Sequence, residues 1–182
     1  MYFIRRFFKS NVACKYNCLI LLVCVFNVSA QNIELPNPRL TPGAVDMSVN
    51  QDNIHATVCV RGYTDRVRPD KEYTNRLKHD QLRHYHYSDV NPKNYEEDHL
   101  IPLNIGGSPS DSKNLWPQPR SGEWSSEQKN DLEFIVYKMV CRGEISLHEA
   151  QQRMATDWIQ AYKDLVPSHR YLLPKHRRDI RD

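Results

Sequence analysis

The chain has 182 residues, with 25 Lys/Arg against 22 Asp/Glu, and 40% of it is hydrophobic. Residues 1–30 contain four basic residues and no acid, so the other 152 residues hold 21 basic and 22 acidic side chains, a net charge of −1. That length suffices for one domain with its own core. Because the net charge of these residues is close to zero, it gives no reason to expect a polyanionic partner.

Residues 1–30 have the pattern of a secretory signal peptide. A basic front precedes a short apolar run at 18–28, and Val28-Ser29-Ala30 provides small residues for cleavage. A membrane anchor is the alternative, although a spanning helix needs roughly 20 apolar residues. Lipid attachment through Cys24 is the weaker alternative. We expect a periplasmic or secreted mature protein that is free of the membrane.

The cysteines support the same export prediction. Cys14, Cys18 and Cys24 leave with the signal, and Cys59 and Cys141 remain as a pair. We predict one disulfide between them, with two buried free thiols as the alternative. Closing so long a loop would contribute roughly 3 to 5 kcal/mol. No CxxC motif exists, which excludes a structural zinc site built from cysteines.

The first predicted elements are a lead-in, a strand and a helix. Residues 31–50 carry three prolines, which favours extended chain. Apolar residues alternate over 53–60, and this alternation predicts a short strand. Residues 70–86 have a helical apolar stripe, with Asp70 as the expected cap. Three histidines of this helix should face solvent: His79, His84 and His86.

Two further helices are predicted in the second half of the chain. Ser125 and Gln128 form a capping box, apolar residues follow at helical spacing, and Gly143 should end the helix. The last helix should begin near Ser146 and stop at Pro167.

Residues 87–124 lack long periodicity and hold the most informative motifs. Asp98–Leu103 predicts a short strand that begins with an acid and an imidazole, Gly106-Gly107 predicts a turn, and Asn114–Trp116 predicts a second strand ended by Pro117. Because neighbouring strand residues face opposite sides, Asp98 and His99 can share a site only at a strand end or a bulge. We expect Trp116 and Trp124 to be packing residues.

The string DHLIPLNIGGSPSDSKNLWPQ, residues 98–118, resembles the core of HNH-type nucleases, which have a ββα-metal fold. The likeness lies in Asp-His at the first strand, a P-x-x-x-G-G turn, and an Asn-Leu fifteen residues after His99. More narrowly, the chain resembles secreted bacterial proteins that carry DHLIPL…GG…NLWP. The stretches CVRGYT, VRP and YTN are also similar to that group, without a known role.

The resemblance implies a catalytic site for phosphodiester hydrolysis. His99 would take a proton from water, and Asp98 would bind a divalent ion, Mg²⁺ or alternatively Mn²⁺ or Zn²⁺. Asn114 would either orient His99 or hold the two strands in place. The alternative for His99 is a surface histidine beside acids.

The helix after NLWP departs from the family, because it has no histidine before His148. Helical geometry puts Lys129 and Glu133 at the edge of the apolar face, so we predict Glu133 as the second metal ligand and Lys129 as a phosphate contact. An i,i+4 ion pair between them is the alternative. Asn130 is the alternative ligand, and Glu127 should point away. Arg120 is a further candidate for phosphate binding.

Together these observations predict an exported, monomeric α+β domain over residues 31–182. Its core, at 95–142, would be a small ββα-metal hairpin and helix with additional helices and one disulfide. The predicted activity is metal-dependent endonucleolytic cleavage of DNA or RNA with little sequence preference, through contacts to the phosphate backbone. A secreted binding or structural module that keeps the fold without catalysis is the alternative. A hydrolase of another phosphodiester or of cell-wall material is a third possibility.

Overall fold

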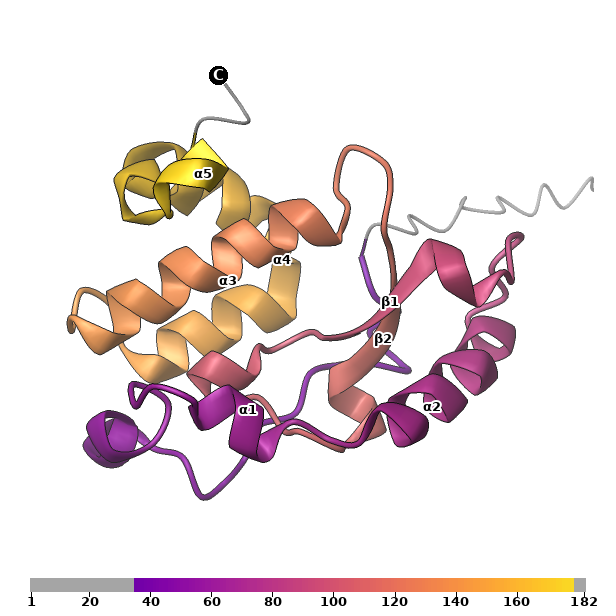
Figure 1. Ribbon diagram of the computed structural model, residues 1–182, viewed down its shortest axis with the longest axis horizontal. Helices are drawn as coiled ribbons and strands as arrows, with labels where there is room; N and C mark the ends of the chain where they lie inside the picture. The colour runs from indigo at the N-terminus through magenta and orange to yellow at the C-terminus, as the bar shows by residue number, and fades with distance from the viewer. Residues whose placement is uncertain (1–34, 179–182) are drawn as a thin grey trace, which may run out of the picture. The chain divides into compact units, whose positions relative to one another are not determined.

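A two-stranded antiparallel hairpin lies at the centre of the fold (Figure 1). In this computed structural model, which describes residues 35–178, β1 (Tyr95–His99) pairs with β2 (Leu115–Pro119), and His99 stands opposite Leu115. β1 therefore ends at His99, and the predicted strand over 98–103 was wrong. The strand stops because the side chain of Asn114 binds both the N–H and the carbonyl of Ile101.

β2 continues through Pro117 and Pro119, so the prediction that Pro117 ends it was also wrong. Alternate residues of a strand direct their backbone groups to the same side. The Leu115 carbonyl accepts hydrogen bonds from Thr41 and Gln81 rather than from β1, so this set of residues faces the outer edge. Pro117 and Pro119 belong to this set. They lack a backbone N–H donor, but the pairing with β1 requires no donor at these positions.

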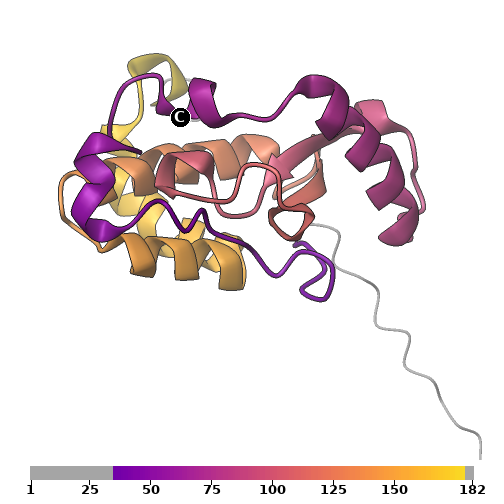
Figure 2. The same ribbon diagram turned by 90° about the horizontal axis from the view of Figure 1, so that it is seen from below.

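Of the three long helices, α2 (Lys71–His84) lies on one side of the hairpin, and α3 (Ser126–Cys141) and α4 (Leu147–His169) lie on the other (Figure 1). α2 packs against both strands, while α3 lies beside α4. Two shorter helices are α1 (Tyr63–Val67) and α5 (Lys175–Arg178). In Figure 2 the segment with α1 lies on the opposite side of α3 from α4.

The helices α2 and α3 begin where the capping signals predict. The Asp70 carboxylate accepts the backbone N–H of Glu72 at 2.6 Å. The Gln128 side chain accepts the backbone N–H of Ser125 at 3.2 Å. Gly143 follows α3 with φ of +72°, a conformation that favours glycine. The apolar face of α3 is fully buried, which confirms the predicted helix and its orientation.

The predicted strand over 53–60 was wrong, because residues Gln51–Ala56 form a 3₁₀ helix followed by turns. The Asn50 side chain accepts the N–H groups of Asp52 and Asn53, and this local cap favours a helical turn. Of the alternating apolar residues, only Ile54 and Val58 are buried, and their separation of four suits a helical turn.

α4 passes through Pro167, so the prediction that this proline ends the helix was wrong. The irregularity occurs earlier, at Asp157, where φ is −160° and ψ is 92°. The Asp157 carboxylate accepts the N–H of Gln160 at 2.9 Å and caps the second half of the helix.

Cys59 and Cys141 form the predicted disulfide, which joins the segment after the first 3₁₀ helix to the end of α3. All described residues belong to one compact unit with mixed α+β structure. None of its helices is long and apolar enough to cross a membrane. The predicted signal peptide, with Cys14, Cys18 and Cys24, lies outside the described residues.

Candidate functional site

The candidate site is a small cleft of about 100 Å³ at the end of β1. Asp98, His99 and Glu133, which the sequence analysis selected, all line this cleft. The side chains come from α1 and its cap, β1, the 3₁₀ turn Leu103–Ile105, and α3. The remaining lining residues are Thr64, Arg68, Glu96, Pro102, Leu103, Asn104 and Asn130.

The end of β1 lets Asp98 and His99 face the same cleft despite their adjacent positions. His99 is buried, and its Nε2 lies 2.9 Å from the carbonyl oxygen of Pro109. A carbonyl only accepts, so Nε2 carries the proton and Nδ1 carries the lone pair in the neutral ring. Burial lowers the pKa of His99 below its ordinary value, although the Pro109 bond and Asp98 oppose this. The neutral ring therefore has a proton acceptor at neutral pH.

Asn114 holds the loop that carries this carbonyl. Its Nδ2 donates to the carbonyls of Ile101, at 2.9 Å, and Ser108, at 3.0 Å, and it is fully buried. Ser108 is the neighbour of Pro109, whose carbonyl binds His99. Asn114 therefore fixes the hairpin loop directly and the imidazole only through that loop.

Lys129 lies behind the cleft and not in it. Its ammonium is completely buried and donates to Asp98 Oδ2 and to the carbonyl of His99, each at 2.7 Å, and also to Glu133. Burial alone would lower the pKa of Lys129, but Asp98 and Glu133 more than offset this and raise it. The ion pair with Glu133 that the spacing allowed is present. We therefore assign Lys129 to holding the two carboxylates and not to binding phosphate.

Glu133 and Asn130 both reach the cleft from α3, while Glu127 is not among the lining residues. Burial raises the pKa of Glu133 to about 7, because the attraction of Lys129 does not fully offset lost solvation and the repulsion of Asp98. The side chain thus changes charge near neutral pH unless another cation joins it.

Three of the lining residues were not predicted from the sequence: Thr64, Arg68 and Asn104. Thr64 and Arg68 belong to the CVRGYT and VRP stretches, which the resemblance left without a role, and the fold brings both to the cleft. Arg68 is exposed and close enough to His99 to lower its pKa. Neither residue has a spacing signal that links it to His99. Asn104 follows the DHLIPL string, but nothing in its sequence context distinguishes it from a turn residue.

Oxygen atoms of three side chains in the cleft could hold a hard divalent cation: those of Asp98, Glu133 and Asn104. Lys129 engages one oxygen of Asp98 and one of Glu133, and the second oxygen of each has no hydrogen-bond partner among the described residues. The Asn104 Oδ1 is buried without a partner. Carboxylate and amide oxygens are the ligands that Mg²⁺ prefers, together with water. No group of three or more His, Cys, Asp or Glu side chains that could hold a metal ion occurs among residues 35–178.

Arg120 lies outside the cleft, at the other end of β1. Its guanidinium pairs with Glu96 at 3.0 Å and donates to the carbonyl of Tyr95 at 3.2 Å.

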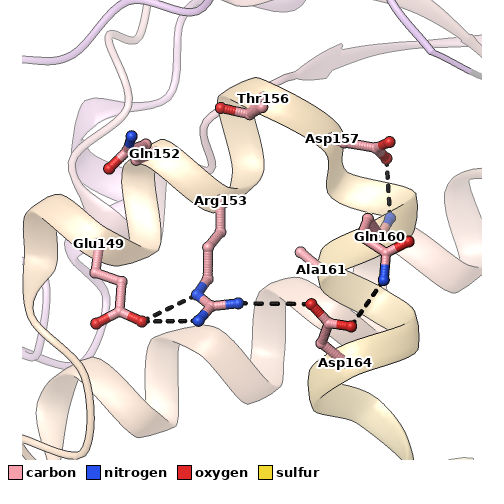
Figure 3. Close-up of a pocket in the computed structure, with 8 residues that line it drawn as sticks. All are labelled: Glu149, Gln152, Arg153, Thr156, Asp157, Gln160, Ala161 and Asp164. Atoms are coloured by element: carbon pink, nitrogen blue, oxygen red, sulfur yellow. Dashed lines mark hydrogen bonds and ion pairs between the residues drawn. The ribbon is translucent and has the colours of Figure 1, made fainter.

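A second hollow, of about 360 Å³, lies at the irregular turn of α4 (Figure 3). There Arg153 extends between Glu149 and Asp164, at 2.9 and 3.7 Å. Its charged side chains are therefore engaged with one another, and we assign no ligand to it.

Comparisons with protein-family models, with curated proteins and with solved structures found no match for this chain.

Proposed function

We propose that the protein is an exported, metal-dependent endonuclease that hydrolyses phosphodiester bonds of DNA or RNA at the cleft. The main support is the convergence of Asp98, His99 and Glu133 on one cleft, although 34 residues separate Asp98 from Glu133 along the sequence by way of a second strand. The order of β1, β2 and α3 agrees with a ββα-metal core. The disulfide is compatible with export.

In this proposal His99 is the general base. Its Nδ1 accepts the proton of the attacking water, while Nε2 remains bonded to Pro109 and fixes the ring. Because burial lowers the pKa of His99, the base stays neutral at a pH where an ordinary histidine is partly charged. Arg68 is the cationic group that binds the non-bridging oxygens of the phosphate.

Asp98 and Glu133, with Asn104, are the residues that would hold the metal ion. A bound divalent ion would stabilise the charge of the phosphate and of the leaving oxygen. Lys129 keeps the two carboxylates on one side of the cleft and balances their charge before the ion arrives. Because contacts would be mainly to phosphate, we expect little sequence preference.

Plasmid cleavage tests this proposal. The purified chain without residues 1–30 should nick supercoiled plasmid in Mg²⁺ or Mn²⁺, and EDTA should stop it. His99→Ala should reduce the rate by about 100-fold or more, because it removes the base. His84→Ala, an exposed histidine of α2, is the matched control and should cleave at the wild-type rate. Equal rates for wild type and the folded His99→Ala variant would refute the assignment.

A non-catalytic binding module is the second candidate function. It is favoured by the position of Lys129, whose ammonium already pairs with both carboxylates that a metal would need. Calorimetric titration with Mg²⁺ and Mn²⁺ separates the two candidates. Metal binding that Asp98→Asn abolishes supports the nuclease, whereas absence of binding together with an intact plasmid supports the module.

A further inference from the structure

A third cavity, about 350 Å³ in volume, lies between α2, the turn Pro92–Asn94 and the far end of the hairpin. Three cationic side chains line it: Lys78 from α2, Lys93 from the turn, and Arg120 from the end of β2. Of the described residues that line it, none is acidic. We call this cavity the basic pocket. Its charge suits an anion.

The fold holds two of these cations close together. Lys78 Nζ and Arg120 Nε donate to the same carbonyl oxygen, that of Tyr95, at 3.4 and 3.2 Å. Arg120 also pairs with Glu96, whereas Lys78 and Lys93 form no ion pair with any acid of residues 35–178. The basic pocket therefore retains positive charge that the described part of the protein does not neutralise by pairing.

The basic pocket and the cleft are neighbours along β1. Glu96 lines the cleft, and its partner Arg120 lines the basic pocket. Tyr95 lines the basic pocket and Asp98 lines the cleft. Three residues of a strand span about 10 Å. A phosphate backbone of several nucleotides is long enough to cover this separation.

We propose that the basic pocket binds a backbone phosphate of the same nucleic-acid strand whose phosphodiester lies in the cleft. This inference rests on the proposed nuclease function and makes it more specific. The substrate would then be a strand long enough to occupy the cleft and the basic pocket at the same time. Arg120 then contacts phosphate as the sequence analysis expected, but at a second position and not at the reacting group.

Oligonucleotide binding without cleavage tests the proposal. Fluorescence anisotropy in EDTA would measure the Kd of labelled single strands of two and eight nucleotides. The variant Lys78→Ala/Lys93→Ala/Arg120→Ala should bind the eight-nucleotide strand about 10-fold or more weakly, with an unchanged Kd for the dinucleotide. The slope of log Kd against log salt should fall by about 0.7 for each phosphate group that the variant no longer binds.

The control removes the same charge elsewhere, with Arg142→Ala/Lys163→Ala/Lys175→Ala, and should bind the eight-nucleotide strand like wild type. Equal losses in the two triple variants would overturn the proposal, because net charge alone would explain them. The proposal would also be overturned if millimolar inorganic phosphate displaced the octanucleotide and the triple pocket variant kept the wild-type preference for longer strands. The basic pocket would then bind a free anion. Lys93→Ala alone, at an exposed position, gives the same test if the triple variant fails to fold.

The two proposals fail in different ways. Hydrolysis of the small chromogenic diester bis(p-nitrophenyl) phosphate reports only on the cleft, and there the pocket variants should match wild type while His99→Ala is inactive. If neither wild type nor any variant hydrolyses a phosphodiester, the nuclease proposal fails. Fluorescence anisotropy still shows whether the basic pocket binds the longer strand. If cleavage occurs and all variants bind eight nucleotides equally, only the pocket proposal fails.

Discussion

Lys129 illustrates how one side chain organises the site from behind. Its ammonium is completely buried between two carboxylates and a carbonyl, so removing it leaves Asp98 and Glu133 without their buried counter-charge. Breaking a buried ion pair on one side costs about 3 to 5 kcal/mol. The sequence placed Lys129 and Glu133 on one edge of a helix, but periodicity cannot distinguish an edge residue that faces solvent from one that faces an acid across a hairpin.

Lys129→Met should therefore lower the free energy of unfolding by about 3 kcal/mol at pH 8, as measured by urea denaturation. The loss should be smaller at pH 5.5, because burial raises the pKa of Glu133 to about 7 and the carboxyl then carries a proton. Lys138→Met on the same helix is the control and should change stability by less than about 1 kcal/mol. A Lys129→Met variant as stable as the control would contradict the structural role.

Glu97 gives the protein an unusual pH dependence. Both carboxylate oxygens are buried without a hydrogen-bond partner among the described residues, and burial raises the pKa of Glu97 to about 9 despite the attraction of Lys78. Between pH 4.5, the ordinary value, and 9, the folded chain binds a proton that the unfolded chain releases. The free energy of unfolding contributed by this group therefore falls as pH rises through that window.

Glu97→Gln should remove this dependence and stabilise the protein by at least about 2 kcal/mol at pH 8.5, with little effect at pH 4.5. Urea denaturation in EDTA at several pH values measures it. Glu123→Gln, at an exposed position, should leave the pH profile unchanged. A parallel profile for Glu97→Gln and wild type would show that Glu97 ionises normally.

At the scale of elements, the hairpin loop depends on one close backbone approach. A Cβ atom at Gly107 would lie 1.7 Å from the carbonyl oxygen of Ile101, which also accepts the Asn114 side chain. Gly106, with φ of +75°, provides the turn before it. The two adjacent glycines are therefore needed for different reasons. Gly107 leaves space for the Ile101 carbonyl, and Gly106 adopts a positive φ.

Gly107→Ala should cost more than about 3 kcal/mol, because the loop must open and Asn114 must lose its partners. Thermal unfolding followed by circular dichroism measures the change. Gly143→Ala is the comparison, since it has open space and only an unfavourable φ of +72°, and should cost about 1 to 2 kcal/mol. Equal melting temperatures for the two variants would contradict the importance of the close approach.

The elements that sequence reasoning predicted well are those that local signals define. Asp70 and Ser125 mark helix starts through caps, and Gly143 marks a helix end. The strands were harder, because long-range partners set their limits. β1 stops at His99 owing to the Asn114 side chain, fifteen residues away, and β2 continues through Pro117 because its outer edge needs no donor.

The residues of the candidate site also divide into those that local sequence signals reveal and those that only long-range packing brings together. Asp98 and His99 belong to one contiguous string, and Glu133 follows from helical spacing, so sequence reasoning selected all three. Arg68 and Asn104 reach the cleft only through the packing of α1 and of the loop, and no periodicity connects them with His99. The same limit applies to Lys78 and Lys93, which the basic pocket joins with Arg120 only in three dimensions.

At the scale of the whole molecule, the disulfide closes a loop of 82 residues that contains the hairpin and every lining residue of the cleft. Constraining a loop of this length stabilises the folded state by about 3 to 5 kcal/mol in the chain-entropy account.

The double variant Cys59→Ser/Cys141→Ser should therefore unfold at least about 10 °C lower than wild type in differential scanning calorimetry. Dithiothreitol should lower the melting temperature of wild type toward that of the variant and leave the variant unchanged. A wild type indifferent to reduction would mean that the bond contributes little.

The same bond links the two walls of the cleft. Cys59 lies in the segment that leads to Thr64 and Arg68, and Cys141 ends the helix that carries Asn130 and Glu133. A newly made chain in a reducing cytosol would lack this link, and we expect its Arg68 wall to open more often. In the exported nuclease that we propose, oxidation after export would then act as the maturation step and would spare the nucleic acids of the producing cell.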